Sequence, residues 1–254
     1  MKRLSQEFLR VPLAHRGLHD VSDGRPENSR AGVNAAIAAG YGLEIDLQLS
    51  SDGQAMVFHD YDLTRLTGTS GALRLRSAEE LTRLPLAGGD EGIPTLREVL
   101  QLVGGQVPLL IELKDQDGAM GTTVGPLERA TADAIDNYAG PVAVMSFNPN
   151  SVAELARCAP DVARGLVTCA YDPQIEALPE DICDHLREIP DYDRVGATFI
   201  SHDVIDLNRP RVAALHEAGA NVLCWTVQSL EQEEQARKIA ENITFEGYLP
   251  VIPS

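Results

Sequence analysis

In this 254-residue chain, three carboxylates and two cations lie on predicted strands or at their ends. Such residues can bind a metal ion and an anion. The carboxylates are Glu44, Asp46 and Glu112, and the cations are Arg16 and Lys114. Carboxylates that converge on one point repel one another unless a cation joins them. Ligation by oxygen alone suits Mg²⁺, Ca²⁺ or Mn²⁺ better than zinc. The residue types therefore predict a divalent-metal site.

Strand geometry brings these side chains together. Glu44 and Asp46 are two positions apart, so they share one face of a strand, and Glu112 and Lys114 do the same. Asp52-Gly53 lies between two apolar runs and indicates a β-hairpin. A two-residue turn there would place Asp46 directly opposite His59, on the same face.

Short apolar runs alternate along the chain with stretches of helical periodicity, which is typical of a parallel sheet. The predicted strands are 11–15, 43–49, 55–59, 107–113, 142–147, 164–168, 197–201, 222–227 and 245–249. The predicted helices are 29–39, 96–103, 127–138, 151–158, 209–218 and 230–240, with one more at 77–84.

An eight-stranded (β/α)8 barrel, the TIM fold, accounts for this alternation. Nine runs are one too many, but parallel neighbours need a long crossover, so the run 55–59 is interpreted as an antiparallel return of the second strand. The other eight runs form the barrel, whose active sites lie at the carboxyl ends of the strands. We expect one barrel domain over residues 1–254, with a rim insertion at about 61–94.

Each residue also has an ordinary structural interpretation. His15 could cap a loop, and Arg16 could hold a structural salt bridge. Glu112 with Lys114 could be a simple ion pair, and Trp225 could be a core residue. The acids of the second strand are harder to explain in this way, because apolar residues flank them on a strand that should be buried on both faces.

The set of motifs, in order along nearly the whole chain, resembles the glycerophosphodiester phosphodiesterase family. The motifs are His15-Arg16-Gly17, Pro26-Glu27-Asn28-Ser29, Glu44-Ile45-Asp46-Leu47-Gln48, Ser51-Asp52-Gly53, Val57-Phe58-His59-Asp60, Ile111-Glu112-Leu113-Lys114, Ser146-Phe147 and Trp225-Thr226-Val227. The family is a barrel with an insertion after the His-Asp motif.

The resemblance implies roles for these residues. His15 and His59 resemble the general acid–base pair, while Glu44, Asp46 and Glu112 resemble the ligands of one divalent metal ion, Mg²⁺ or Ca²⁺ with Mn²⁺ as a further candidate. A histidine pair suits both proton-transfer roles, because neutral and protonated imidazole coexist near neutral pH. Which histidine is the acid, and whether water or a neighbouring hydroxyl attacks, stays open.

The remaining implied roles concern the substrate. Arg16 resembles a phosphate ligand and Lys114 a second phosphate-facing cation. Glu27 and Asn28 resemble a pair bordering the site, and Trp225 resembles part of the substrate wall. Relatives usually carry Gly-x-x-Thr-Asp-x-Pro on the last strand. This chain has Phe245-Glu246-Gly247-Tyr248-Leu249-Pro250 there, without the aspartate.

The expected reaction is hydrolysis of a glycerophosphodiester to glycerol 3-phosphate and an alcohol. Two alternatives are another phosphodiester, such as a lysophospholipid, and a catalytically inactive barrel that binds a ligand. The formal charge of −17 disfavours nucleic acid and acidic membranes as partners. With no apolar leader or long apolar span, we expect a cytoplasmic protein without stable membrane anchoring; the oligomeric state stays open.

Overall fold

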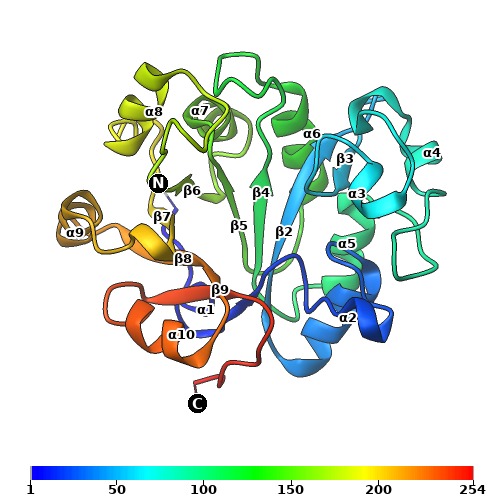
Figure 1. The fold of residues 1–254 in the computed structure, drawn as a ribbon, viewed down its shortest axis with the longest axis horizontal. Helices are drawn as coiled ribbons and strands as arrows, with labels where there is room; N and C mark the ends of the chain where they lie inside the picture. The colour runs from blue at the N-terminus through cyan, green and yellow to red at the C-terminus, as the bar shows by residue number, and fades with distance from the viewer. Residues whose placement is uncertain (1, 254) are drawn as a thin grey trace.

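Eight parallel strands close into a barrel in the computed structural model, which describes residues 2–253 (Figure 1). The strands are β1 Leu13–Ala14, β2 Gly42–Leu49, β3 Ala55–Val57, β4 Leu109–Leu113, β5 Val142–Ser146, β6 Ala163–Thr168, β7 Phe199–Asp203, β8 Asn221–Val227 and β9 Asn242–Phe245. β1 pairs in parallel with both β2 and β9, which closes the ring, and β3 is an antiparallel partner of β2 alone. The predicted TIM barrel is confirmed.

Helices surround this barrel (Figure 1). They are α1 Glu7–Arg10, α2 Arg30–Ala39, α3 Thr64–Thr67, α4 Ala78–Leu81, α5 Leu96–Val103, α6 Pro126–Ile135, α7 Pro149–Cys158, α8 Glu180–Arg187, α9 Pro210–Glu217 and α10 Leu230–Ala236, with short 3-10 turns η1 Val21–Asp23, η2 Leu73–Leu75 and η3 Val204–Asp206. The sequence did not predict α1, α3 or α8. None of the helices described is long and apolar enough to cross a membrane.

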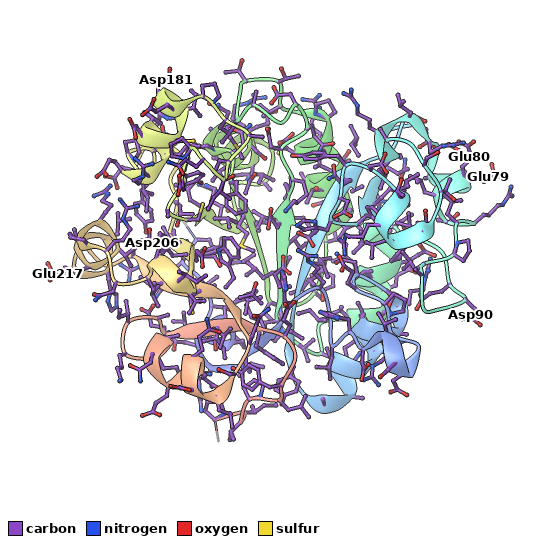
Figure 2. The ribbon with its side chains drawn as sticks, viewed as in Figure 1. Glu79, Glu80, Asp90, Asp181, Asp206 and Glu217 are labelled. Carbon is purple, nitrogen blue, oxygen red and sulfur yellow. The ribbon has the colours of Figure 1, made fainter. Side chains whose placement is uncertain are left out.

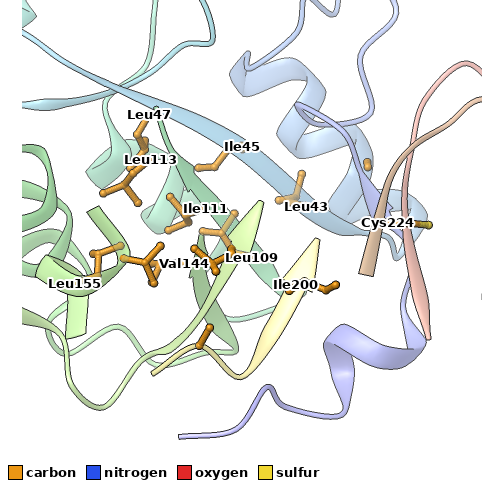
Figure 3. Packing of buried hydrophobic residues seen from close by; sticks show 14 of the residues in the cluster. Leu43, Ile45, Leu47, Leu109, Ile111, Leu113, Val144, Leu155, Ile200 and Cys224 are labelled. Atoms are coloured by element: carbon orange, nitrogen blue, oxygen red, sulfur yellow. The ribbon is translucent and has the colours of Figure 1, made fainter. Parts of the chain in front are cut away.

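The alternation of β2 sorts its side chains between two environments. Leu43, Ile45 and Leu47 pack outward in the large apolar cluster that also contains residues of the surrounding helices (Figure 3). Glu44 and Asp46 point the other way, into the barrel. Such inward acids carry a desolvation cost that an ordinary core would not tolerate.

A second apolar cluster fills the amino-terminal end of the barrel. Phe8 of α1 is 1 % exposed and packs there with Leu13, Leu110 and Phe199. The amide of Asn242 donates hydrogen bonds to the carbonyl oxygens of Phe8, at 2.8 Å, and Val11, at 2.6 Å. Because this end of the barrel is filled, side chains that enter from the carboxyl ends of the strands meet a rigid floor.

The hairpin between β2 and β3 differs from the prediction by one residue. Leu47 pairs with Val57 and Leu49 with Ala55, so Asp46 lies opposite Phe58 and not opposite His59. The loop has three residues because Ser50 already pairs with Gln54, with Ser50 N donating to Gln54 O at 3.0 Å. His59 lies beyond the end of β3, so its approach to Asp46 depends on the loop after the strand and not on the pairing register.

Gly53 provides the left-handed residue that this three-residue loop needs. Its φ is +80°, and no atom lies within 4 Å of the position of an added Cβ. We therefore expect Gly53→Val to lower the free energy of unfolding by about 1–3 kcal/mol, through backbone strain alone. Thermal unfolding measures the loss, with Gly53→Asn as control, because asparagine tolerates positive φ. An equal loss in both variants would contradict strain as the cause.

The last strand also begins earlier than predicted. The expected run was 245–249, whereas β9 ends at Phe245 and Gly247 turns the chain with φ +77°. Glu246 is consequently the first residue past the carboxyl end of a barrel strand.

The segment 61–94 contains α3, α4 and η2. Its apolar residues pack on Met56 and Phe58 in a small cluster of their own. Its assignment as a rim insertion of a single domain remains a prediction.

Candidate active site

The loop after β1 brings the first motif over the barrel mouth. His15 N donates to Phe245 O at 2.9 Å, and Arg16 and Gly17 both have positive φ, at 54° and 80°. A Cβ at Gly17 would lie 3.0 Å from the carbonyl carbon of Gly32, so the close approach requires glycine. The positive φ of Arg16 is unusual for a residue with a side chain. Such strain concentrates at functional positions.

The three predicted metal ligands converge inside the barrel. Asp46 and Glu112 are register partners on β2 and β4. One oxygen from each of Glu44, Asp46 and Glu112 lies within 4.8 Å of the others. The three residues are 2 %, 1 % and 7 % exposed. Burial, together with Asp46 and Glu112, raises the pKa of Glu44 well above its usual value. A divalent cation would offset this repulsion, and the all-oxygen donor set fits Mg²⁺, Ca²⁺ or Mn²⁺.

Two cationic side chains form ion pairs with the carboxylate cluster. Lys114 Nζ lies 2.8 Å from Glu112 Oε1 and 3.5 Å from Asp46 Oδ1, and Arg16 Nε lies 3.3 Å from Asp46 Oδ2. Burial acts against the ionisation of Asp46, but Lys114, His59 and Arg16 hold the pKa of its carboxyl well below the usual range. Burial likewise acts against the charge of Lys114, yet Glu112 and Asp46 raise its pKa above the ordinary value.

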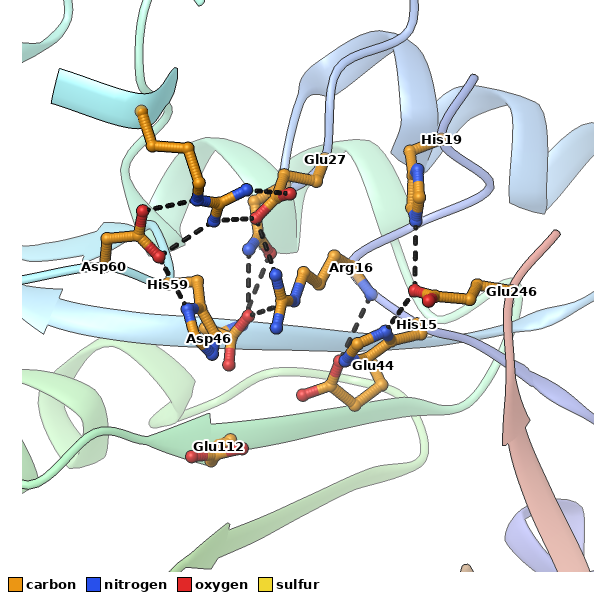
Figure 4. A network of polar contacts seen from close by, with 12 residues as sticks. His15, Arg16, His19, Glu27, Glu44, Asp46, His59, Asp60, Glu112 and Glu246 are labelled. Atoms are coloured by element: carbon orange, nitrogen blue, oxygen red, sulfur yellow. Dashed lines mark hydrogen bonds and ion pairs between the residues drawn. The ribbon is translucent and has the colours of Figure 1, made fainter. Parts of the chain in front are cut away.

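His59 is held by a network that also reaches Arg16 (Figure 4). Its Nδ1 lies 2.8 Å from Asp60 Oδ1, and Arg65 donates to both oxygens of Asp60, at 2.6 and 2.8 Å. The same Arg65 donates to both oxygens of Glu27, which accepts from Arg16 as well at 2.8 Å. Burial lowers the pKa of His59, which favours its neutral imidazole.

His15 has a carboxylate partner of its own. Its Nδ1 lies 2.7 Å from Glu246 Oε2, which is also 3.5 Å from His19 Nε2. Gln228 donates to the other oxygen of Glu246 at 2.7 Å. Hydrogen bonds from His15 and His19 hold the pKa of Glu246 well below its usual value. Each histidine of the predicted pair therefore has its Nδ1 fixed by a carboxylate, and its Nε2 is left for chemistry.

Asn28 and Trp225 complete the set that the sequence singled out. Asn28 is fully buried and donates to Asp46 Oδ2 at 3.0 Å, which orients that carboxylate. Trp225 donates its indole N–H to Ser201 O at 2.9 Å and packs edge-on against Phe147, with ring centroids 5.5 Å apart.

All ten predicted site residues lie at this mouth. Of these, His15, Arg16, Glu44, Asp46, His59, Glu112, Lys114 and Trp225 line one cavity of about 110 Å³. Glu27 and Asn28 stand behind it and contact Arg16 and Asp46.

Sequence reasoning missed the carboxylates and the arginine behind the histidines. Asp60 stood in the quoted His-Asp motif, so its adjacency to His59 was a usable signal. Arg65 follows one turn later, in a run without periodic pattern. Glu246 was obscured because the last strand was placed too late. The excess negative charge, by contrast, is spread over exposed acids at the periphery, such as Glu79, Asp90 and Glu217 (Figure 2).

Comparison with known proteins identifies the family of the chain. The model of the glycerophosphoryl diester phosphodiesterase family matches residues 15–242. The chain belongs to this family. It is thereby a phosphoric diester hydrolase.

Members of the family from bacteria align with much of the chain. YhdW of Bacillus subtilis, named as a glycerophosphodiester phosphodiesterase, is 30 % identical over 226 residues, covering 85 % of this chain and 86 % of the relative. A glycerophosphodiester phosphodiesterase of Caldanaerobacter subterraneus is 34 % identical over 167 residues, covering 61 % of this chain and 65 % of the relative. A solved phosphodiesterase from Oleispira antarctica, in complex with the product sn-glycerol-3-phosphate, shares the fold with a TM-score of 0.75 at 23 % identity over 93 % of each chain.

Proposed function

We propose that the chain hydrolyses glycerophosphodiesters to glycerol 3-phosphate and an alcohol, using one divalent metal ion and the histidines His15 and His59. The observation that carries the proposal is a single cavity lined by three buried carboxylates, two histidines and two cations. The Oleispira phosphodiesterase of the same fold binds sn-glycerol-3-phosphate, which supports this substrate class.

The reaction first requires that the negative charge on the phosphate be neutralised. Arg16 and Lys114 would bind the non-bridging oxygens and neutralise the charge that grows on them. Glu44, Asp46 and Glu112 would hold the metal ion, which supplies Lewis-acid stabilisation of the same oxygens. The hydrogen bond from Asn28 keeps the carboxylate of Asp46 in position.

The two histidines differ in how far their carboxylate partners are neutralised. Asp60 accepts two hydrogen bonds from Arg65 beside that of His59, so its charge is shared with a full cation. Glu246 has His15, the ring of His19 and a neutral Gln228. Glu246 therefore keeps more negative charge beside His15 than Asp60 keeps beside His59, and burial lowers the pKa of His59. We assign His59 as the base that takes the proton of the attacking oxygen, and His15 as the acid that protonates the leaving alcohol.

The products test the reaction directly. Phosphorus NMR of a glycerophosphodiester incubated with the metal-loaded protein should show glycerol 3-phosphate, with the free alcohol measured separately. Formation of the phosphorylated alcohol with free glycerol would mean that the other ester bond is cut. That result, or no hydrolysis at all, would overturn the proposal.

Glu246→Gln tests the role of the carboxylate behind His15. The amide keeps the shape and a hydrogen-bond acceptor but loses the negative charge beside His15. We expect kcat on an alkyl diester to fall by about tenfold or more, with little change in KM. The loss should be smaller on an aryl diester, whose leaving group needs no proton, whereas a structural effect would lower turnover of both esters equally. Gln228→Ala is the matched control, and an equal loss of alkyl-ester turnover in that variant would remove the charge argument.

A lysophospholipid as substrate has one supporting observation. Leu75, Ile175 and Ile205 are 73 %, 80 % and 88 % exposed and lie in segments that follow β3, β6 and β7. The rim therefore carries exposed apolar side chains that an acyl chain could contact. Two substrates that differ only in an acyl chain on the glycerol distinguish a glycerophosphodiester from a lysophospholipid as the substrate. We expect the substrate without the acyl chain to be hydrolysed faster.

A further inference from the structure

A second, larger cavity opens directly beside the catalytic one. It measures about 790 Å³, against about 110 Å³ for the inner cavity. The two share His59, Glu112, Lys114, Phe147 and Trp225 along their common wall. A diester whose phosphate lies between Arg16 and Lys114 would therefore extend one of its two alcohols into the outer cavity. The small inner cavity suits the glycerol phosphate portion common to the substrate class, which leaves the outer cavity for the variable alcohol.

The wall of the outer cavity carries unpaired negative charge. Asp62, Asp115, Glu176 and Asp203 line the cavity, and among the residues that the structure describes none of the four forms an ion pair. The cations of the same wall are already engaged, since Lys114 pairs with Glu112 and Asp46, and Arg65 with Glu27 and Asp60. The part of the cavity away from the phosphate therefore favours positive charge.

Aromatic rings form the rest of this wall. Tyr61, Phe147, Tyr171 and Trp225 all line the cavity. Phe147 lies edge-on between Tyr171 and Trp225, at centroid distances of 6.3 and 5.5 Å with interplanar angles of 90° and 83°. Lys114 Nζ is already 5.8 Å from the Phe147 centroid. Aromatic rings with nearby carboxylates recognise ammonium groups through cation–π and ion-pair attraction, and they do so best where water is displaced.

We propose that the outer cavity is a subsite for a positively charged leaving alcohol, that is, an amino-alcohol or quaternary-ammonium head group. The inference rests on the proposed function and names its substrate class. Glu176 and Tyr61 are the specificity-determining residues we select. Glu176 is partly buried, and within residues 2–253 its one side-chain hydrogen bond comes from the thiol of Cys169, at 3.8 Å. Tyr61 is half exposed at the cavity edge.

The experiment compares glycerophosphocholine with its carbon isostere, the glycerophosphate ester of 3,3-dimethylbutanol. The two differ only in the charge of the head group. We expect kcat/KM of the metal-loaded protein to favour the choline ester by at least about tenfold. Glu176→Gln and Tyr61→Leu should each reduce the ratio of the two kcat/KM values by about threefold or more. Glu217→Gln, which removes an exposed carboxylate on α9, should leave the ratio unchanged.

Two results separate this inference from the proposed function. Equal hydrolysis of both esters would overturn the cationic subsite while leaving the phosphodiesterase reaction intact. The same holds if neither Glu176→Gln nor Tyr61→Leu changes the ratio. Hydrolysis of neither ester would overturn the proposed function itself, and the inference with it.

Discussion

His15→Ala and His59→Ala should each lower turnover of an alkyl glycerophosphodiester by about 10²–10⁴-fold. Both side chains line the cavity of the carboxylate cluster, and each has its Nδ1 fixed by a carboxylate, Glu246 or Asp60. Neither contributes to the apolar core, so circular dichroism and thermal unfolding should show an intact fold in both variants.

The leaving group separates the two roles. A p-nitrophenolate leaves without being protonated, so the acid is not needed for bis(p-nitrophenyl) phosphate. We therefore expect His15→Ala to lose much less activity on this aryl ester than on the alkyl ester. His59→Ala should lose similar activity on both, because the attacking oxygen must be deprotonated in either case. The reverse pattern would exchange the assignments, and similar losses for both variants on both esters would remove them.

Surface histidines provide the controls. The side chains of His185 and His216 are 55 % and 46 % exposed and lie on α8 and α9, so alanine at either position should leave turnover unchanged. His202 is not a suitable control. It is fully buried with its Nδ1 2.8 Å from Thr168 Oγ1, so its replacement should cost stability.

Glu44→Gln should abolish measurable metal-dependent turnover, with a loss of at least about 100-fold. The amide keeps the shape of the side chain but removes one of the three carboxylates proposed to hold the metal ion. Glu112→Gln is a second test of the same cluster, and Asp181→Asn, an exposed acid on α8, is the control. If the Glu44→Gln variant retained wild-type turnover, the carboxylate cluster would have no role in the reaction.

Although Glu44→Gln should abolish turnover, it should not lower the stability of the metal-free protein. Burial, Asp46 and Glu112 raise the folded-state pKa of Glu44, so its native carboxyl contributes most stability below the unfolded-state pKa and loses that contribution as the pH rises through the folded-state value. The neutral amide avoids this loss. At neutral pH without metal, the variant should therefore be at least as stable as the wild type, whereas Mg²⁺ should raise Tm only for the wild type. Thermal unfolding with and without Mg²⁺ measures both effects.

Much of the fold and the carboxylate cluster could be predicted because both depend on strand alternation. Apolar residues at 43, 45 and 47 face the helices, so the acids at 44 and 46 must face the barrel interior. Parallel pairing then places Asp46 beside Glu112. Neither step requires knowledge of the loops.

The features that sequence reasoning missed depend on loops and on a helix with few apolar residues. Asp52-Gly53 fits a two-residue turn as well as the three-residue loop observed, and the two differ by one position in register. Gly247 ends β9 within an apolar run, which displaced the predicted strand and obscured Glu246. α8 is mostly polar and buries only Cys183 and Leu186, so its apolar periodicity was too sparse to detect.

The hydrogen-bond network behind His59 could not be predicted from local sequence patterns, for another reason. Arg65 joins Asp60 to Glu27, which lies 38 positions earlier in the chain. Only the folded arrangement of the loops after β1 and β3 brings them together, because charged residues on loops carry no periodic signal.

Metal dependence tests the account most directly. Protein stripped with EDTA and passed into metal-free buffer is titrated with Mg²⁺, Ca²⁺ or Mn²⁺ in a calorimeter, while turnover of a glycerophosphodiester is followed over the same additions. The account predicts no turnover in the stripped protein, one ion bound per chain, and turnover that rises along the binding curve. Full turnover in rigorously metal-free protein would contradict it.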